Sequence, residues 1–344
     1  MTMTPGSGTL SRSPDPLMLL LLLACADEPG DSGSKGPHGG RDSADDSGTD
    51  SGGDSGDDSG RDTEGETGAD TDTGLTRAEE VCQRWAADRA DLSEGSWTGN
   101  TSTCDAGDIS GRGRENALRL TNLYRWMAGQ PEVTDDPTRN AAAQECALME
   151  HLHGSLSHYP DASWACYTAE GAGAAGSSNI ASAAAVYAVD MYMLDWGNET
   201  TIGHRRWLLS NQLGPVGIGS TNQYSCMWVI YGSGGGTAPW VAWPPPGPIP
   251  EDAFFDGGGL GVDDTGWTLQ SDSIDLSRAT VTITSGGVDK PVTVSPLLSG
   301  YGSTYAIKML PRGWRVHAGE TYTVQVGGTS PAISYDVEVV GCGR

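Results

Sequence analysis

Residues 26–75 form a tract of Asp, Ser, Gly and Thr that cannot build a folded core. The tract holds 15 acidic side chains against Lys35, Arg41 and Arg61, and it has almost no apolar side chains. Burial cannot compensate the entropy of ordering such a chain, so we predict an acidic, extended tether over residues 25–75. A calcium-binding repeat is the alternative, but the nonapeptide and EF-hand spacings are absent. Folded structure is therefore expected only beyond residue 75.

Charge limits the partners of this chain. It carries 45 acidic and 20 basic side chains, a net charge of −25, and about half of this excess lies in the tether. Binding to phosphate backbones requires clustered Lys and Arg. We therefore expect no nucleic-acid partner.

The N-terminus resembles an export signal with a lipid anchor. Residues 17–24 are apolar, too few to span a bilayer but typical of the hydrophobic core of a signal peptide. Leu22-Leu23-Ala24-Cys25 resembles the lipobox of bacterial lipoproteins, in which the cysteine is diacylated and becomes the mature N-terminus. We predict a signal peptide over residues 1–24 and a lipid on Cys25. The expected location is the bacterial cell envelope, at the outer membrane or cell surface. A plain signal peptide and a secreted protein are the alternative.

Six further cysteines indicate disulfides, because an even set in an exported protein reads as a disulfide framework. Fifteen pairings are possible. We prefer sequence neighbours, which gives Cys82 with Cys104, Cys146 with Cys166, and Cys226 with Cys342. Zinc binding by these cysteines is the alternative, but no CxxC pair occurs.

Helices are expected first along the chain and strands later. Apolar residues at helical spacing predict helices over 114–128, 137–152 and 180–195, with another starting near Gly203. Buried strands are expected at 227–231 and 240–243. Helices followed by strands, without alternation, favour an α+β fold.

A series of motifs over residues 114–245 resembles the CAP (SCP-like) superfamily, which includes the cysteine-rich secretory proteins, antigen 5 and the pathogenesis-related 1 proteins. The resemblance implies an α-β-α sandwich with a central antiparallel sheet and a cleft on one face. The motifs are Asn122-Leu-Tyr-Arg125, Leu156-Ser-His158, Ser177-Ser-Asn-Ile180, Gly203-His-Arg-Arg-Trp-Leu-Leu209 and Val216-Gly-Ile-Gly219.

The resemblance also implies a set of cleft residues. The two family histidines fall on His158 and His204. One family acid lies three residues after an aromatic, which matches Tyr192 and Asp195. The other is the Glu of a Gly-Glu-Asn triplet, and here Ser178 stands in its place. One carboxylate of the family set is therefore missing.

These residues leave two chemistries open. His158, His204 and Asp195 could hold a divalent cation such as Zn²⁺, with an open position that activates water for hydrolysis. Alternatively, the histidines fix the surrounding loops and the cleft only binds. Loss of the Glu favours the second interpretation. The tryptophans of this segment could line a cleft for glycan, sterol or acyl chains, although core packing is the simpler account for most of them.

A second module is expected over residues 249–344. The proline-rich run from Trp243 to Pro248 is predicted to end the CAP-like domain, residues 76–248. Short alternating strands separated by Gly-rich turns indicate a β-sandwich that resembles Ig-like modules. The expected strands are 279–284, 290–294, 305–309, 321–326 and 333–340.

Together these features predict a monomeric, lipid-anchored envelope protein. Its CAP-like cleft is expected to bind a glycan, lipid or protein of the envelope without catalysis. The alternative is a metal-dependent, protease-like hydrolase that uses His158, His204 and Asp195.

Overall fold

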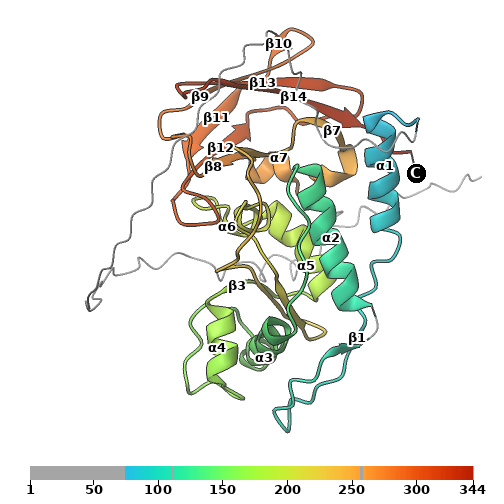
Figure 1. Cartoon of the computed structure of the whole chain (residues 1–344), viewed down its shortest axis with the longest axis vertical. Coiled ribbons are helices and arrows are strands. Elements are labelled where there is room, and N and C mark those ends of the chain that lie inside the picture. Colours follow the sequence, from blue (N-terminus) through green and yellow to red (C-terminus); the bar gives the residue numbers. More distant parts are fainter. Residues whose placement is uncertain (1–73, 111, 256–258, 344) are drawn as a thin grey trace, which may run out of the picture. The chain divides into compact units, whose positions relative to one another are not determined.

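The computed structural model describes residues 74–110, 112–255 and 259–343 (Figure 1). By its internal contacts the chain divides into two units, and every described residue except Gly74 belongs to the same one. The expected signal peptide, the lipobox with Cys25 and nearly all of the tether lie outside the described residues.

The elements follow the expected order, with most helices before most strands. The helices are α1 Arg77–Asp88, α2 Gly113–Met127, α3 Pro137–His153, α4 Ala169–Ala175, α5 Ala185–Leu194, α6 Gly203–Leu208 and α7 Val262–Thr265, with a 3-10 turn, η2, at Glu251–Phe254. The strands are β1 Ser96–Trp97, β2 Ile109–Ser110, β3 Ser178–Ala181, β4 Gly217–Ser220, β5 Ser225–Trp228, β6 Val241–Trp243, β7 Gly247–Pro250, β8 Trp267–Ser271, β9 Thr280–Ser285, β10 Val288–Asp289, β11 Val292–Pro296, β12 Tyr305–Pro311, β13 Thr321–Gly327 and β14 Ile333–Val340.

An α-β-α sandwich forms the first half of the described chain. Its sheet has the antiparallel order β3-β5-β4. Ile180 and Cys226 face one side, where they pack on α3 and α4, whereas Ala181 and Met227 face the core shared with α2 and α5. Alternation of side chains across a strand thus supplies both layers, and the expected α+β fold is confirmed.

Glycines in β4 allow α3 to lie directly on this sheet. A Cβ on Gly219 would stand 2.1 Å from the backbone carbonyl carbon of Ala143. Only glycine permits so close an approach of two backbones. The Val-Gly-Ile-Gly motif is therefore a packing feature of the fold.

Local signals explain the helix ends. Asp136 caps α3 by accepting from the N–H of Arg139, Pro137 occupies the first turn, and Gly154 ends the helix in the left-handed conformation at φ 75°. The predicted helices at 114–128, 137–152 and from Gly203 are confirmed within a residue or so. The predicted helix at 180–195 is wrong at its start, because residues 178–181 pair with β5 and the helix begins at Ala185.

Two sheets form the β-rich C-terminal region. One has the order β10-β9-β13-β14-β7 and the other β11-β12-β8-β6. They pack face to face, since the rings of Trp267 on β8 and Tyr322 on β13 meet edge to face with centroids 6.0 Å apart. Alternation along β13 and β14 buries one face of each strand.

The two halves share one hydrophobic core. The expected boundary at residues 248 and 249 falls inside β7, which pairs with β14, and β6 already pairs with β8. Tyr124 of α2 meets Trp243 of β6 edge to face with ring centroids 5.4 Å apart. The proline-rich run therefore connects β6 to β7, and each of these strands belongs to one of the C-terminal sheets.

All three predicted disulfide pairs are wrong, although the six cysteines do pair. The bonds are Cys82–Cys342, Cys104–Cys166 and Cys146–Cys226. The first joins α1 to the segment after β14, since α1 packs beside β7 and β7 pairs with β14. The second joins the β1–β2 hairpin to the α3–α4 connection, and the third joins α3 to β5. Distance along the sequence did not predict distance in space.

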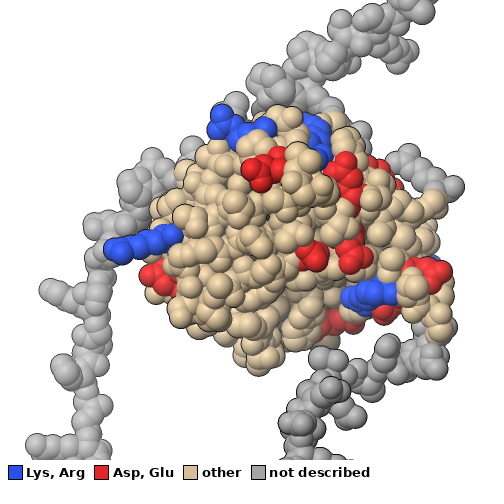
Figure 2. Space-filling model, turned by 90° about the horizontal axis from the view of Figure 1, so that it is seen from above, with Lys and Arg blue, Asp and Glu red and all other residues tan. Residues whose placement is uncertain are grey.

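Among the described residues, the face formed by β9, β13 and β14 has no large cluster of charge of one sign. Figure 2 looks onto the top of Figure 1, where β9, β13 and β14 lie, and shows scattered charged side chains of both signs on a mostly uncharged face. Exposed positions of these strands include Thr280, Thr282, Gln325 and Ser334. No helix of the described residues is long and apolar enough to cross a membrane.

Candidate functional site

His204 and Asp195 form a pair at the turn between α5 and α6. Nδ1 of His204 lies 3.0 Å from Oδ1 of Asp195, whose side chain is fully buried. Asp195 ends α5 in the left-handed conformation, at φ 55°, which directs its carboxylate back toward α6. The backbone N–H of Arg205 donates to Oδ2 at 3.1 Å and the amide of Asn198 donates to Oδ1 at 2.7 Å.

The electrostatics of this pair indicate an ionised carboxylate. Burial by itself would raise the pKa of Asp195, but the charge of His204 and the hydrogen bonds from His204, Asn198 and Arg205 outweigh it and lower the pKa. Because an ionised carboxylate only accepts, Nδ1 of His204 carries the proton. Its Nε2 is then the atom left for chemistry.

His158 is held in a similar way by a carbonyl. Its Nδ1 lies 2.9 Å from the carbonyl oxygen of Ala175, so Nδ1–H donates. Burial lowers the pKa of His158, the bond to Ala175 opposes this, and the nearby charge of His204 lowers it further. We call His158, Asp195 and His204 the histidine site.

Asn179 in β3 and Tyr192 in α5 support His204. The amide of Asn179 donates to the carbonyl of His204 at 3.0 Å, and the hydroxyl of Tyr192 donates to the carbonyl of Asn179 at 3.0 Å. The Tyr192 ring lies against the imidazole with centroids 5.3 Å apart. The Ser-Ser-Asn-Ile motif and the aromatic three residues before Asp195 signalled these positions, whereas no sequence signal pointed to Asn198.

Ser178 offers little in place of the family carboxylate. Its side chain is buried, and Oγ has no hydrogen-bond partner among the residues that the structure describes. A hydroxyl there supplies neither the charge nor the two oxygens of a Glu.

Glu150 is a buried acid that the sequence did not single out. It lies on α3 and is fully buried, and both its oxygens lie 3.1 Å from the backbone N–H of Ser157, which precedes His158. Burial raises the pKa of Glu150 to about 8 against the opposing effect of that hydrogen bond. Glu150 therefore holds the loop that carries His158.

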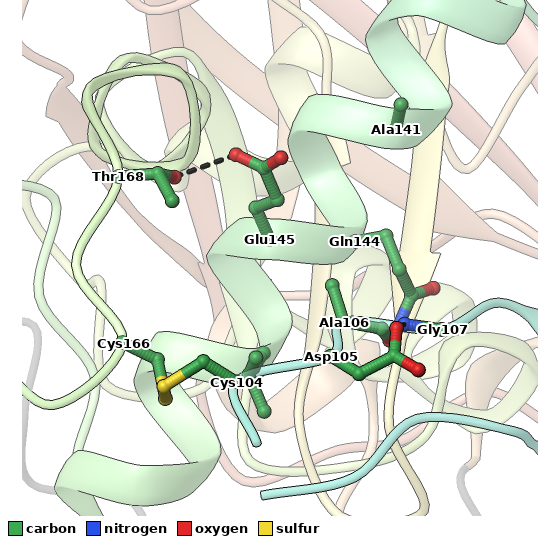
Figure 3. A pocket seen from close by; sticks show the side chains of 10 residues that line it. Cys104, Asp105, Ala106, Gly107, Ala141, Gln144, Glu145, Cys166 and Thr168 are labelled. Atoms are coloured by element: carbon green, nitrogen blue, oxygen red, sulfur yellow. Dashed lines mark hydrogen bonds between the residues drawn. A yellow bond between two sulfur atoms is a disulfide. The ribbon is translucent and has the colours of Figure 1, made fainter.

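A pocket of about 300 Å³ lies elsewhere, between α3, α4 and the β1–β2 hairpin (Figure 3). The Cys104–Cys166 disulfide, Gln144, Glu145 and Thr168 line it, and the hydroxyl of Thr168 donates to Glu145 at 2.6 Å. None of its lining residues belongs to the histidine site. The histidine site and this pocket therefore lie in different places.

Residues 118–231 match the CAP family, described as the cysteine-rich secretory protein family. The match supports the CAP superfamily for this segment, about a third of the chain, and all three residues of the histidine site lie within it. No curated protein and no solved structure matches the chain. CAP domains suggest a binding or extracellular role in general, and the three disulfides of the described residues fit an exported protein.

The donor set does not fit a hydrolytic metal centre. The oxygens of Asp195 are enclosed and accept from three neighbours, so Asp195 orients His204 rather than facing a metal. Ser178 removes the other carboxylate. Within the described ranges, no group of three or more His, Cys, Asp or Glu is arranged to hold a metal ion. A catalytic zinc usually needs three protein ligands, and among the described residues of the histidine site two imidazole Nε2 atoms remain.

Proposed function

We propose that this chain is an exported, lipid-anchored envelope protein whose CAP segment binds an envelope ligand at the histidine site without catalysing a reaction. The observation that carries the proposal is the anchoring of both imidazoles through Nδ1, by Asp195 and by the carbonyl of Ala175. Such anchoring orients two polar groups in advance, and binding gains from groups that need no reordering.

The lack of an exposed carboxylate at the site favours binding over catalysis. A general base must reach the proton that it removes, but Asp195 is enclosed and a serine stands at position 178. The metal-dependent hydrolase is the alternative function, and the test below includes it.

Exposed aromatic residues next in sequence to two site residues suggest how a ligand is bound. Tyr159 follows His158 and is 87% exposed, and Trp196 follows Asp195 and is 41% exposed. Neighbouring Cα atoms are 3.8 Å apart, so both rings start next to site residues. Aromatic faces with a polar tip suit glycans and lipid headgroups.

The binding test uses the full chain with Cys25→Ser, which removes the expected lipid. Sedimentation with purified peptidoglycan and with phosphatidylethanolamine–phosphatidylglycerol vesicles is compared with pull-down from an envelope protein extract. We expect one of these to bind, and His158→Ala/His204→Ala to weaken it about tenfold, the loss of one or two polar contacts. The matched control is His153→Ala/His317→Ala, which truncates two exposed histidines.

Two results would contradict the proposal. Equal binding by the site variant and the control would show that the histidine site is not the binding surface. Zinc-stimulated hydrolysis of casein by the parent protein, lost in the site variant, would establish the hydrolase instead.

The anchor is tested separately in a bacterial host that processes lipoproteins. Labelled palmitate should enter the parent chain, and Cys25→Ser should abolish both the label and retention in the membrane fraction. A variant that stays labelled would refute the lipobox. In the proposal the tether, with 15 acidic residues over 26–75, keeps the folded part away from the lipid surface.

A further inference from the structure

Ile202, two residues before His204, has an uncommon backbone conformation. Its φ and ψ are 42° and 48°, in the left-handed region, and its side chain is fully buried. A β-branched residue is a rare occupant of this region. Such a conformation persists only when the surroundings impose it, and it concentrates at functional sites.

The surroundings of Ile202 come from the C-terminal region. Ile202, Leu297 and Ala306 form a small core cluster of their own, separate from the main core. Leu297 follows β11 and Ala306 lies in β12. The residue directly before α6 is therefore packed by a part of the chain outside the CAP match.

Residues 297–303 also grip the turn through the backbone. The N–H of Leu298 donates to the carbonyl of Thr200 at 3.0 Å, and the guanidinium of Arg206 donates to the carbonyl of Leu298 at 2.6 Å and to the hydroxyl of Ser303 at 3.0 Å. A Cβ on Gly302 would lie 2.5 Å from the carbonyl oxygen of Arg206. The two segments are in direct backbone contact on both sides of His204.

The dihedrals of Ile202 set the direction in which Gly203 and His204 leave the turn. Relaxation of Ile202 to negative φ would rotate the first turn of α6 relative to Asp195, which lies at the opposite end of the same turn. We propose that residues 297–303 are part of the histidine site: by holding Ile202 in the left-handed conformation they orient the His204 imidazole onto Asp195. Ile202 and Leu297 are then positioning residues.

The turn between α5 and α6 also has internal hydrogen bonds that could orient His204 without the C-terminal region. The backbone carbonyl of Asn198 accepts from the N–H of Ile202 at 2.7 Å, and the side-chain amide of Asn198 donates to the carboxylate of Asp195. The experiment must therefore separate the effect of the C-terminal region from that of the turn. The proposal concerns the orientation of His204 and does not depend on which ligand the site binds.

The Nδ1–H proton of His204 reports that orientation in the full chain labelled with ¹⁵N-histidine. Its resonance is assigned by its disappearance in His204→Gln. In Leu297→Ala the resonance should vanish or exchange with water at least about tenfold faster, as expected for a locally opened hydrogen bond. The matched control is Leu298→Ala, because Leu298 is the next residue and its side chain is 54% exposed. Leu298→Ala should keep the proton, and so should Leu297→Met, which conserves volume.

Wild-type exchange of the His204 proton in a folded Leu297→Ala chain, with unchanged circular dichroism, would overturn the proposal. Equal loss in Leu297→Ala and Leu298→Ala would also overturn it, because packing on Ile202 would then not be the cause. If Leu297→Ala does not fold, Leu297→Val replaces it. An intermediate exchange rate in that variant supports the proposal and an unchanged rate refutes it. Sedimentation of the same chains reads ligand binding separately, so the two proposals fail independently.

Discussion

The two histidines of the site are held by different parts of the molecule. His158 depends on neighbours within the CAP segment, the carbonyl of Ala175 and the buried Glu150 that bonds Ser157. His204 lies in the first turn of α6 and pairs with Asp195 at the end of α5, and hydrogen bonds from Arg205 and Arg206 join α6 to Gly266 and Leu298 of the C-terminal region.

The His204 side of the site depends on the C-terminal half through the hydrogen bonds of Arg205. Arg205 is fully buried, and it donates to carbonyls of Met193, Leu194 and Gly266. A buried guanidinium is tolerated only when its donors are satisfied. The CAP segment cannot satisfy Arg205 without residue 266, so this half of the site is completed from outside the segment.

Arg205→Ala should destabilise the His204 side of the molecule more than any other substitution considered below. The substitution leaves carbonyls of both halves without a donor and opens a cavity, so the free energy of unfolding should fall by about 4 kcal/mol in a urea titration. The matched control is Arg112→Ala, whose side chain is 72% exposed and which should change stability by less than about 0.5 kcal/mol. Equal effects of the two variants would show that Arg205 does not join the halves.

The His158 side should respond to pH through Glu150. Its folded pKa of about 8 lies above the unfolded value of 4.5, so the native state binds more protons between these values and stability falls as pH rises through that window. The free energy of unfolding should drop by roughly 3 kcal/mol from pH 5 to pH 8. Glu150→Gln should flatten this decline in urea titrations at each pH.

Glu79→Gln is the control for that pH series. Its carboxylate is exposed at the start of α1, and hydrogen bonds from Thr76 lower its pKa, so its contribution is lost only in acid. The decline from pH 5 to pH 8 should persist in this variant. A decline that also persists in Glu150→Gln would assign it to another group.

Asn198→Ala should lower the stability of the turn between α5 and α6 by a smaller amount. It removes one donor to the buried carboxylate of Asp195, and a hydrogen bond to a charged group contributes about 1.5 kcal/mol. Thermal or urea unfolding measures the loss. Asn222→Ala, at an exposed turn, should change stability by less than about 0.5 kcal/mol. A loss as small in Asn198→Ala would mean that Arg205 N–H and His204 alone hold Asp195.

His153→Ala should have the smallest effect, on the His158 side. His153 stacks on Trp164 with ring centroids 3.6 Å apart, but its side chain is exposed. Loss of the stack should lower the free energy of unfolding by about 0.5 kcal/mol. The change in tryptophan fluorescence identifies the Trp164 environment. A loss above about 2 kcal/mol would show that this stack, and not Glu150, holds the loop.

Much of the fold could be read from local patterns. Apolar spacing placed α2 and α3, and alternation placed the strands of the C-terminal region, because these signals act over a few residues. The start of the predicted helix at 180 failed because Ile180 is equally apolar in a buried strand, and only pairing with Cys226 decides between the two. The predicted division at residue 248 rested on local composition, whereas β6 and β7 pair with strands that follow much later in the chain.

The site could be predicted only in part. The resemblance placed His158, Asp195 and His204, and the structure brings the last two within 3.0 Å. It did not predict that Asp195 would be enclosed, that Glu150 would hold the His158 loop, or that Leu297 would pack on Ile202. Each of these depends on burial, which the sequence reports only through neighbouring residues.

By itself the sequence determined the acidic character of residues 26–75 and the classes of element, because composition and short-range periodicity carry that information. The candidate site residues came from the resemblance of its motifs to the CAP superfamily. Only the tertiary structure decided the disulfide pairing, the shared core and the role of Asp195. Those depend on which distant segments meet: Cys82 lies 260 residues from its partner Cys342, and no local pattern encodes that separation.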